Sequence, residues 1–140
     1  MMTPSDTRRL PIGMPPYRDL RVWQHAKKLS VMCAVAAKRF PDEEQCALAD
    51  QLRRAAYSIP LNIAEGAARK GSREFRRFLD TARGSLCEVQ TALEIARDMS
   101  YLSDEEYRQL ESVATETAKT LWGLLRKVDQ TSTRTLKPRP

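Results

Sequence analysis

The chain has 140 residues, with 24 Lys or Arg against 18 Asp or Glu, which gives a formal net charge of +6. A chain of this length forms one domain that can fold without disulfides or metals, and its 5 glycines and few aromatic residues disfavour a sandwich or barrel. This composition favours an all-α protein. Because the chain has neither an apolar run of the ~20 residues that span a bilayer nor a signal-like N-terminus, we expect it to be cytoplasmic and without membrane contact.

The first predicted helix follows residues 1–16, a proline-bearing segment that we expect to be disordered. Asp19 can cap this helix, and Phe40-Pro41 ends it. Between them lies an apolar seam, a row of residues spaced alternately three and four apart that share one helix face. The seam residues are Val22, Ala26, Leu29, Cys33, Ala36 and Phe40.

The second predicted helix starts with negative charge at residues 42–44, which the helix dipole favours, and stops near Lys70-Gly71. Pro60 lies inside it and should kink it near Ala56, because proline lacks an N–H and its ring crowds the preceding turn. The seam of this helix is Leu48, Leu52, Ala55, Ile59, Asn62 and Gly66.

The third predicted helix has the longest seam, and Ser72 can cap its start. Gly84-Ser85 lies in its middle, where glycine costs about 1 kcal/mol relative to alanine, so we expect a neighbouring helix to approach closely there. The seam residues are Phe75, Leu79, Ala82, Leu86, Val89, Leu93 and Ala96.

The fourth predicted helix opens with a capping box of Ser103 and Glu106. Residues 129–140 are polar and basic, and we expect them to form a disordered tail. Four helices with short connections over residues 17–128 pack as an antiparallel up-down-up-down four-helix bundle, with a left-handed supercoil because the seams repeat every seven residues. The fourth seam is Tyr107, Leu110, Ala114, Thr117, Leu121, Leu124 and Val128.

Candidate metal ligands and nucleophiles are few. The three cysteines, Cys33, Cys46 and Cys87, show no CxxC spacing, and His25 is the only histidine. We interpret the cysteines as buried, reduced thiols; a nucleophilic cysteine with His25 as its base is the alternative, which no local motif supports. We therefore predict a protein that is not an enzyme and uses no cofactor or metal.

Asn62 is the polar member of the second seam. A buried amide must be hydrogen-bonded, and the backbone carbonyl that Pro60 leaves free is one candidate acceptor. We favour this structural role, and contact with a ligand is the alternative.

Basic residues concentrate between residues 69 and 83, where six Lys or Arg face only Glu74 and Asp80. Such a field attracts polyanions and gives salt-dependent binding to phosphate backbones, although a solvated helix face is an alternative interpretation. With two arginines of the second helix, the predicted nucleic-acid-binding residues are Arg53, Arg54, Arg69, Lys70, Arg73, Arg76, Arg77 and Arg83.

Apolar residues also lie away from the seams. Leu61 and Ile95 fall on the backs of their predicted helices, and Trp23 and Trp122 fall on the flanks. So many apolar residues off the seams of one small bundle indicate a self-association surface.

Several motifs occur in an order and at spacings typical of one family. They are Leu20-Arg21-Val22-Trp23-Gln24, Phe40-Pro41, Gln51-Leu52-Arg53-Arg54-Ala55-Ala56, Ser58-Ile59-Pro60, Asn62-Ile63-Ala64-Glu65-Gly66 and Ala82-Arg83-Gly84-Ser85-Leu86-Cys87-Glu88. Between about Tyr17 and Val128 the chain resembles the bacterial four-helix-bundle family also called the ribosomal RNA intervening-sequence protein or ribosomal-protein-like family.

The resemblance implies a homo-oligomer, since family members look like pentameric barrels, and it implies no catalytic activity. Some members are encoded inside intervening sequences of large-subunit ribosomal RNA genes, and a related branch serves diversity-generating retroelements as nucleic-acid-binding accessory proteins. The residues that match the family motif, and that serve either binding or packing and assembly, include Asn62, Glu65, Gly66, Gly84, Ser85 and Glu88.

Two of these glutamates have candidate partners. Glu65 can pair with Arg69 four residues on, and across a subunit boundary Glu65 or Glu88 can pair with Arg53 or Arg54. We hypothesise a non-enzymatic homo-oligomeric bundle that binds RNA or DNA through basic helix faces. The competing hypothesis is an adaptor whose oligomer binds another protein and has no nucleic-acid role.

Overall fold

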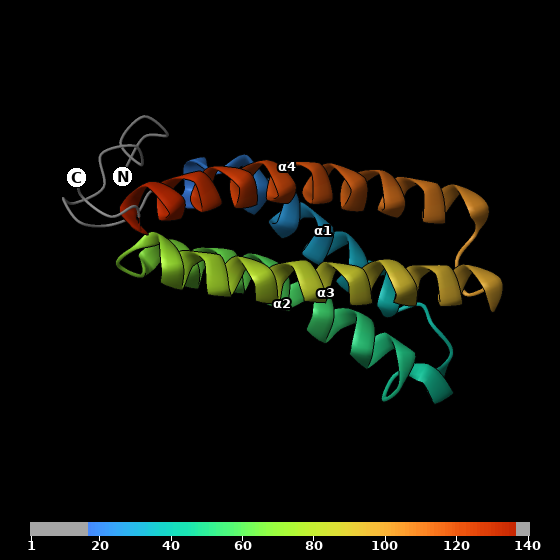
Figure 1. Cartoon of the computed structure of the whole chain (residues 1–140). Helices are drawn as coiled ribbons and strands as arrows, with labels where there is room; N and C mark the ends of the chain where they lie inside the picture. The colour runs from blue at the N-terminus through green and yellow to red at the C-terminus, as the bar shows by residue number, and fades with distance from the viewer. Residues whose placement is uncertain (1–16, 137–140) are drawn as a thin grey trace, which may run out of the picture.

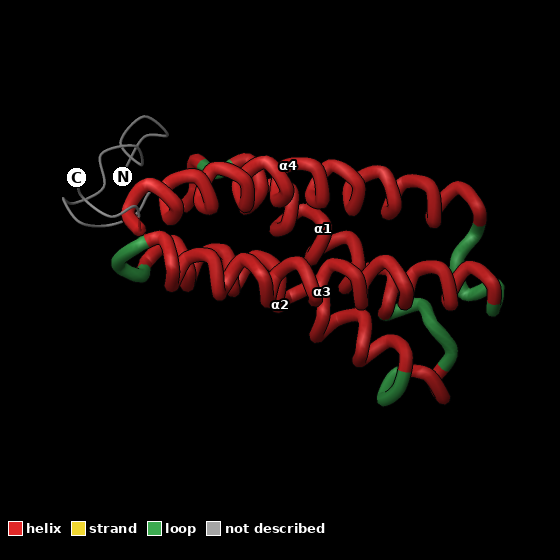
Figure 2. Tube along the Cα trace, viewed as in Figure 1, coloured by secondary structure: helices red, strands yellow, loops and turns green. Residues whose placement is uncertain are grey.

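The computed structural model describes residues 17–136, and the side chains of residues 17–131. The described residues form four α-helices, two short 3₁₀ turns and no strand (Figure 2), which confirms the all-α prediction. No helix among them is long and apolar enough to cross a membrane. The elements are η2 (Tyr17–Asp19), α1 (Arg21–Ala37), η3 (Asp42–Glu44), α2 (Leu48–Ala68), α3 (Ser72–Asp98) and α4 (Asp104–Leu136).

The four helices pack as a closed ring. Each helix contacts the one before and the one after it in the chain, and α1 also contacts α4. Figure 1 shows the start of α1, the α2–α3 turn and the end of α4 at one end of the bundle, and the α1–α2 connection and the α3–α4 turn at the other. We call the first the basic end (residues 17–28, 65–83 and 119–131) and the second the acidic end (residues 38–50 and 88–108).

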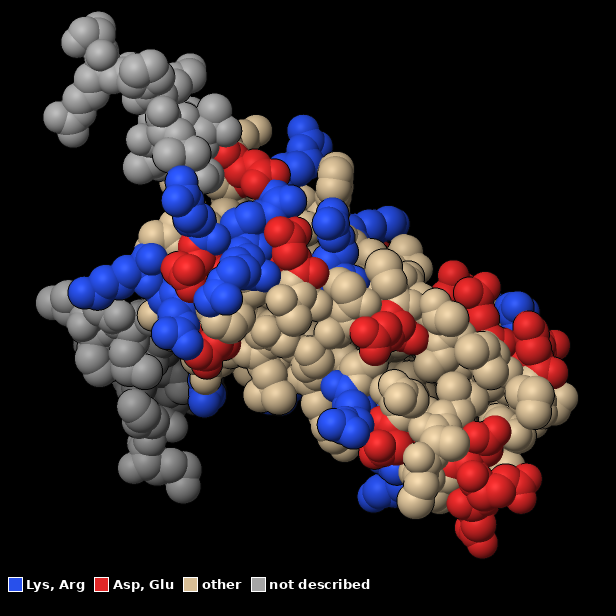
Figure 3. Space-filling view, turned by 60° about the horizontal axis from the view of Figure 1, so that its bottom comes forward, with Lys and Arg blue, Asp and Glu red and all other residues tan. Residues whose placement is uncertain are grey.

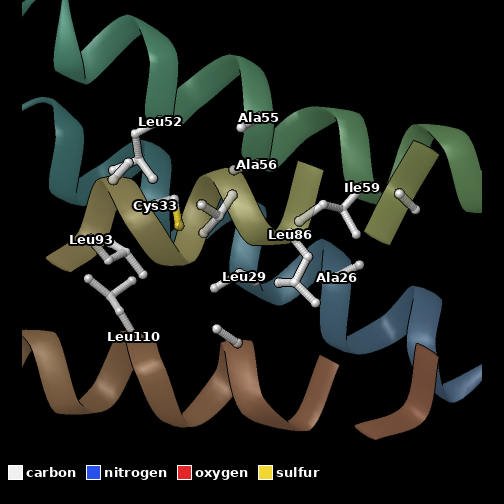
Figure 4. Packing of buried hydrophobic residues seen from close by; sticks show 14 of the residues in the cluster. Ala26, Leu29, Cys33, Leu52, Ala55, Ala56, Ile59, Leu86, Leu93 and Leu110 are labelled. Atoms are coloured by element: carbon white, nitrogen blue, oxygen red, sulfur yellow. The ribbon is translucent and has the colours of Figure 1, made fainter. Parts of the chain in front are cut away.

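Apolar side chains from all four helices meet in one core (Figure 4). Every seam residue predicted for α1 is at most 3% exposed. In α2 and α4, however, the core row passes through Ile63 and Leu125, whereas Asn62 and Leu124 are only half-buried. A step of four residues in place of three keeps the row on the core side, because a helix of 3.6 residues per turn drifts away from a strict seven-residue seam.

Two predicted helix caps are wrong, and so is the predicted start of α2. Asp19 lies in η2, and α1 follows Leu20 without a side-chain cap. Gly71, with a φ of 90° in the left-handed region that glycine tolerates, is the N-cap of α3, so Ser72 is the first residue of the helix. Residues 42–44 form the separate turn η3 and α2 begins only at Leu48, because the chain turns once more before it enters the helix.

The predicted capping box of α4 is confirmed. The Glu106 N–H donates to Ser103 Oγ and the Ser103 N–H donates to Glu106 Oε1, each at 3.1 Å. The Glu106 carboxylate also pairs with Arg39 near the end of α1, at 2.5 Å. These contacts, above all the bond from the Ser103 N–H, lower the pKa of Glu106.

The helix α4 extends beyond its predicted end. Its core row stops at Val128, which is 6% exposed, but the helix continues to Leu136. No proline or glycine interrupts this stretch, and Asp129 accepts a hydrogen bond from Arg76 of α3. Residues 129–136, expected to be disordered, are therefore helical; residues 1–16 and 137–140, also expected to be disordered, lie outside the described residues.

Pro60 lies inside α2, which continues on both sides of it. Because proline has no N–H, the Ala56 carbonyl lacks a donor from its own helix. Ser30 of α1 supplies one, since its Oγ lies 2.8 Å from the Ala56 oxygen and 2.9 Å from the Ala26 oxygen. The acceptor that we assigned to Asn62 is thus taken by a hydroxyl from the neighbouring helix.

Candidate nucleic-acid interface

Charge is divided between the two ends of the bundle. The basic end contains 13 Lys or Arg and 5 Asp or Glu, whereas the acidic end contains 4 and 10. Figure 3 shows basic side chains gathered toward one end of the molecule and acidic ones toward the other. The run at residues 69–83 is visible in the sequence, but the cations of α1 and α4 join it only because the ring of helices brings them to the same end.

Four of the predicted arginines at the basic end are held in ion pairs. A phosphate therefore has to compete with a carboxylate for these guanidinium groups. It can do so because exposed ion pairs of this kind contribute at most ~1 kcal/mol each. Arg76 also joins α3 to α4, and its hydrogen bonds to Asp129 and Asp80 raise its pKa. The pairs are Arg69 with Glu65, Arg76 with Asp80 and Asp129, Arg77 with Glu74, and Arg83 with Asp80.

Lys70 and Arg73 are different, because both are exposed and neither has an ion-pair partner among residues 17–131. Arg126 and Lys127 of α4 are also exposed and unpaired among these residues, and neither is among the binding residues predicted from the sequence. Their position in the fourth helix was the signal that could have found them, since in an up-down bundle the end of the fourth helix lies beside the start of the third.

Arg53 and Arg54 lie away from the basic end, because about 21 Å of helix separates Arg54 from Ala68 at a rise of ~1.5 Å per residue. Arg53 is half-buried, and its guanidinium donates to the Gln45 carbonyl oxygen at 2.8 Å and to Gln45 Oε1 at 3.2 Å. Gln45 in turn donates to the carbonyl oxygens of Ala37 and Phe40 at the end of α1. Arg53 therefore fixes the α1–α2 connection. Arg54 is exposed, 3.7 Å from Asp50.

Asn62 and Ser85 share a contact between α2 and α3. The Asn62 amide donates to Ser58 Oγ at 2.9 Å and to the Ser58 carbonyl oxygen at 2.8 Å. The Ser85 hydroxyl lies 2.8 Å from the same Ser58 Oγ. Two residues of the family-like motif thus have a packing role within one chain, and both donate hydrogen bonds to Ser58.

Two motif glycines stand in opposite surroundings. A Cβ on Gly66 would lie 2.7 Å from the Phe78 Cβ and 3.0 Å from the Phe75 ring, so α3 approaches α2 closely there. A Cβ on Gly84 would meet nothing within 4 Å. The close approach that we predicted at Gly84 is therefore wrong within one chain, because Gly84 faces outward while its neighbour Ser85 faces α2.

The two motif glutamates also differ. Glu65 pairs with Arg69, the residue that follows the end of α2, as expected from their spacing. Glu88 is exposed and lines a shallow hollow of about 380 Å³ between α2 and α3, together with Leu48, Cys87 and Ile95. Pairing of either glutamate with Arg53 or Arg54 across a subunit boundary stays a prediction.

A second hollow, of about 330 Å³, opens at the basic end between the α2–α3 turn and α4. Phe75 is half-buried and Val128 is buried, so they form its apolar floor, whereas the exposed Arg69 and Lys127 stand at its rim. The full set of lining residues is Arg69, Gly71, Ser72, Phe75, Lys127, Val128 and Thr131.

The cysteines and the histidine are dispersed. Burial raises the pKa of Cys33 to about 12, which keeps it a neutral thiol at physiological pH. The prediction of buried thiols is confirmed for Cys33 but is wrong for Cys46 and Cys87, which are exposed. His25 Nδ1 lies 3.4 Å from Thr120 Oγ1. Within residues 17–131, no group of three or more His, Cys, Asp or Glu residues could hold a metal ion.

Several apolar side chains are exposed, as their positions off the seams predicted. Leu61 is 67% exposed, Trp122 57% and Ile95 45%. Trp23 is half-buried instead, with its ring centroid 5.1 Å from that of Tyr17.

Comparisons with known proteins agree with this fold. A solved structure from Bacteroides thetaiotaomicron VPI-5482, a protein with unknown function from the S23 ribosomal protein family, is 24% identical with a TM-score of 0.68, and the match covers 74% of this chain and 97% of that chain. A search of curated proteins found no match. A family model described as 23S rRNA-intervening sequence protein matches residues 18–123. Since this match spans most of the chain, the protein belongs to the 23S rRNA-intervening sequence protein family.

Proposed function

We propose that this protein is a non-enzymatic, homo-oligomeric four-helix bundle of the cytoplasm that binds RNA or other nucleic acid through its basic end. The excess of 13 basic over 5 acidic residues at that end carries the proposal. A cationic surface of this kind attracts phosphate backbones and releases their counterions on binding. The family description names 23S rRNA, so we choose RNA as the first ligand to test.

Contact with the phosphate backbone is the main mode of this proposed binding. Lys70, Arg73, Arg126 and Lys127 are exposed and unpaired among the described residues, so their charge is available. Side chains of this type contact phosphates and set orientation more often than they read bases. The paired arginines, such as Arg69 and Arg77, add to the field and can exchange a carboxylate for a phosphate.

Assembly into a homo-oligomer, a pentamer by family resemblance, is the second part of the proposal. Exposed Leu61, Ile95 and Trp122 support a contact surface between copies. The open position at Gly84 supports it too, because a glycine without a close neighbour in its own chain leaves room for a helix of another. A ring of parallel subunits would place all basic ends on one face and add their fields.

The finer architecture belongs to the same proposal. We infer an antiparallel up-down-up-down order, a left-handed supercoil and a bend of α2 at Pro60. The alternation of helix starts and ends in Figure 1 supports the order, and the seven-residue seams favour the handedness. The Ser30 hydroxyl on the Ala56 carbonyl supports a local opening of α2, since an added donor accompanies many kinks.

Binding of a fluorescent structured RNA over a range of salt concentrations tests the nucleic-acid part. Affinity should fall as salt rises, and Lys70→Ala with Arg73→Ala should lower the salt slope by about 2. The matched control is Lys38→Ala with Arg108→Ala, two exposed cations of the acidic end. Absence of binding at low salt, or binding that does not weaken with salt, would overturn this part.

The adaptor hypothesis is the second candidate function, and the exposed apolar residues favour it. Light scattering tests assembly separately from nucleic-acid binding. A monomeric mass overturns assembly in both hypotheses. An oligomer that binds no nucleic acid at low salt favours the adaptor. Replacement of the exposed Leu61 by Asp should shift the mass toward the monomer if that residue lies in the contact.

A further inference from the structure

The hollow at the basic end combines an aromatic floor with a cationic rim. Phe75 and Val128 line it from α3 and α4, and Arg69 and Lys127 line it from the end of α2 and from α4. Ser72 and Thr131 add hydroxyl groups. An aromatic ring beside cations is the combination with which proteins hold an unpaired base and its phosphate.

The size and position of the hollow restrict what it can take. At about 330 Å³ it lies at the lower end of the range of small-ligand sites, which suits one nucleotide rather than a longer stretch. Its apolar floor can be reached only by a base that is not stacked in a duplex. The neighbouring Lys70 and Arg73 can then contact the phosphates that flank this base.

The rim keeps a charge that no described side chain neutralises. Lys127 has no ion-pair partner among residues 17–131. Arg69 is shared between Glu65 and the face of the Phe78 ring, with its guanidinium carbon 5.3 Å from the ring centroid. Arg69 is therefore held in place at the rim, and Lys127 is the freer cation.

We propose that this hollow holds one unstacked nucleotide of a single-stranded nucleic acid, with the base against Phe75 and a flanking phosphate at Lys127 and Arg69. This inference rests on the proposed function and adds to it, because the wider basic end attracts any polyanion whereas the hollow accepts only an unpaired base. Single strands, loops and frayed ends are then preferred over blunt duplexes.

The test compares three fluorescent ligands on the full chain: a short oligouridylate, an abasic oligomer of equal length and charge, and a blunt-ended RNA duplex. Wild-type protein should bind the oligouridylate at least about fivefold more tightly than the abasic oligomer, as base stacking on an aromatic side chain implies. Phe75→Leu should abolish this preference and leave duplex binding unchanged. Tyr57→Leu, which removes an exposed aromatic side chain that does not line the hollow, should keep it.

Each outcome separates this inference from the wider proposal. Equal binding of oligouridylate and abasic oligomer by the wild type, or the same preference in Phe75→Leu, overturns the inference while salt-dependent binding preserves the proposed function. Failure of all three ligands to bind at low salt overturns both. If circular dichroism shows that Phe75→Leu is unfolded, the exposed Lys127→Met decides: a larger loss for oligouridylate than for duplex supports the hollow, and an equal loss overturns it.

Discussion

The acidic and basic ends of the bundle use their charged side chains in different ways. At the acidic end some of them tie neighbouring helices and connections together: Glu106 pairs with Arg39, and Glu44 accepts a hydrogen bond from the Tyr101 hydroxyl at 2.7 Å, which raises the pKa of Tyr101. At the basic end Lys70 and Arg73 have no partner among the described residues. Net charge alone therefore does not mark a binding surface. Unpaired cations that lie together, as Lys70 and Arg73 do, are the better guide, because the unpaired Lys38 and Arg108 stand among acidic residues.

Charge reversal at each end should give the largest effect. Lys70→Glu with Arg73→Glu should weaken RNA binding at low salt by about tenfold or more, because two attractive phosphate contacts become repulsive. Lys38→Glu with Arg108→Glu, at the acidic end, should change it little. Fluorescence anisotropy measures both, and equal losses would show that the two ends do not differ in function.

Gly66→Ala should destabilise the bundle by about 1–3 kcal/mol, because its Cβ would overlap Phe78 and force α2 and α3 apart near the basic end. Gly84→Ala is the matched control on an open face and should stabilise the monomeric fold by up to about 1 kcal/mol. Urea unfolding gives both values. A comparable loss from the two substitutions would contradict the difference in packing between these positions.

Arg53→Met should cost about 1–2 kcal/mol of stability, because it removes the donors that hold Gln45 and with it the α1–α2 connection. RNA affinity should stay unchanged, since this arginine is engaged within the fold. The exposed Arg54→Met serves as the control and should cost less than about 0.5 kcal/mol. If Arg53→Met weakens RNA binding while stability holds, Arg53 itself is part of the interface.

Ser103→Ala should cost about 1 kcal/mol, the usual loss for an N-cap, because the Glu106 N–H loses its acceptor. Thermal unfolding at neutral pH measures it. Asp104→Ala changes the neighbouring residue without removing the cap and should cost less; an equal cost would mean that charge in the first turn, and not the cap, is responsible.

Glu106→Gln should show the smallest effect and a defined pH dependence. Because folding lowers the pKa of Glu106 below its ordinary value of 4.5, its carboxylate contributes stability above that pH and loses it as the pH falls through the lower folded value. The stability difference between wild type and Glu106→Gln should therefore shrink as the pH falls below 4.5. Urea midpoints at neutral and acid pH check this, and a constant difference would contradict it.

Local sequence patterns predict the α1 seam, from its periodicity, and the capping box of α4, from its residue motif, because both depend on residues close in sequence. Periodicity places the core row at Asn62 and Leu124 instead of Ile63 and Leu125. Packing against other helices decides whether successive core residues are three or four positions apart. Asn62 shows the same limit: its partner Ser58 is local, but the carbonyl at Ala56 is satisfied from α1, which no pattern in α2 reveals.

The candidate site shows the same limit, because contacts between helices are not visible in local sequence patterns. The run of arginines in α3 is a sequence feature, whereas their division into paired and unpaired cations depends on which carboxylate lies within reach. Asp129 pairs with Arg76 from another helix. Lys127 joins the basic end only through the ring of helices, so its place beside Phe75 required the three-dimensional structure.

The hydrogen bond from Ser30 to the Ala56 carbonyl fixes the register of α1 along α2. Pro60 creates an acceptor without a donor at one height along α2, and Ser30 meets it at one height along α1. A shift of α1 by one turn, about 5.4 Å, would leave that buried carbonyl orphaned. The proline thus sets the register of the two helices, and every side chain at the two ends of the bundle inherits its position from it.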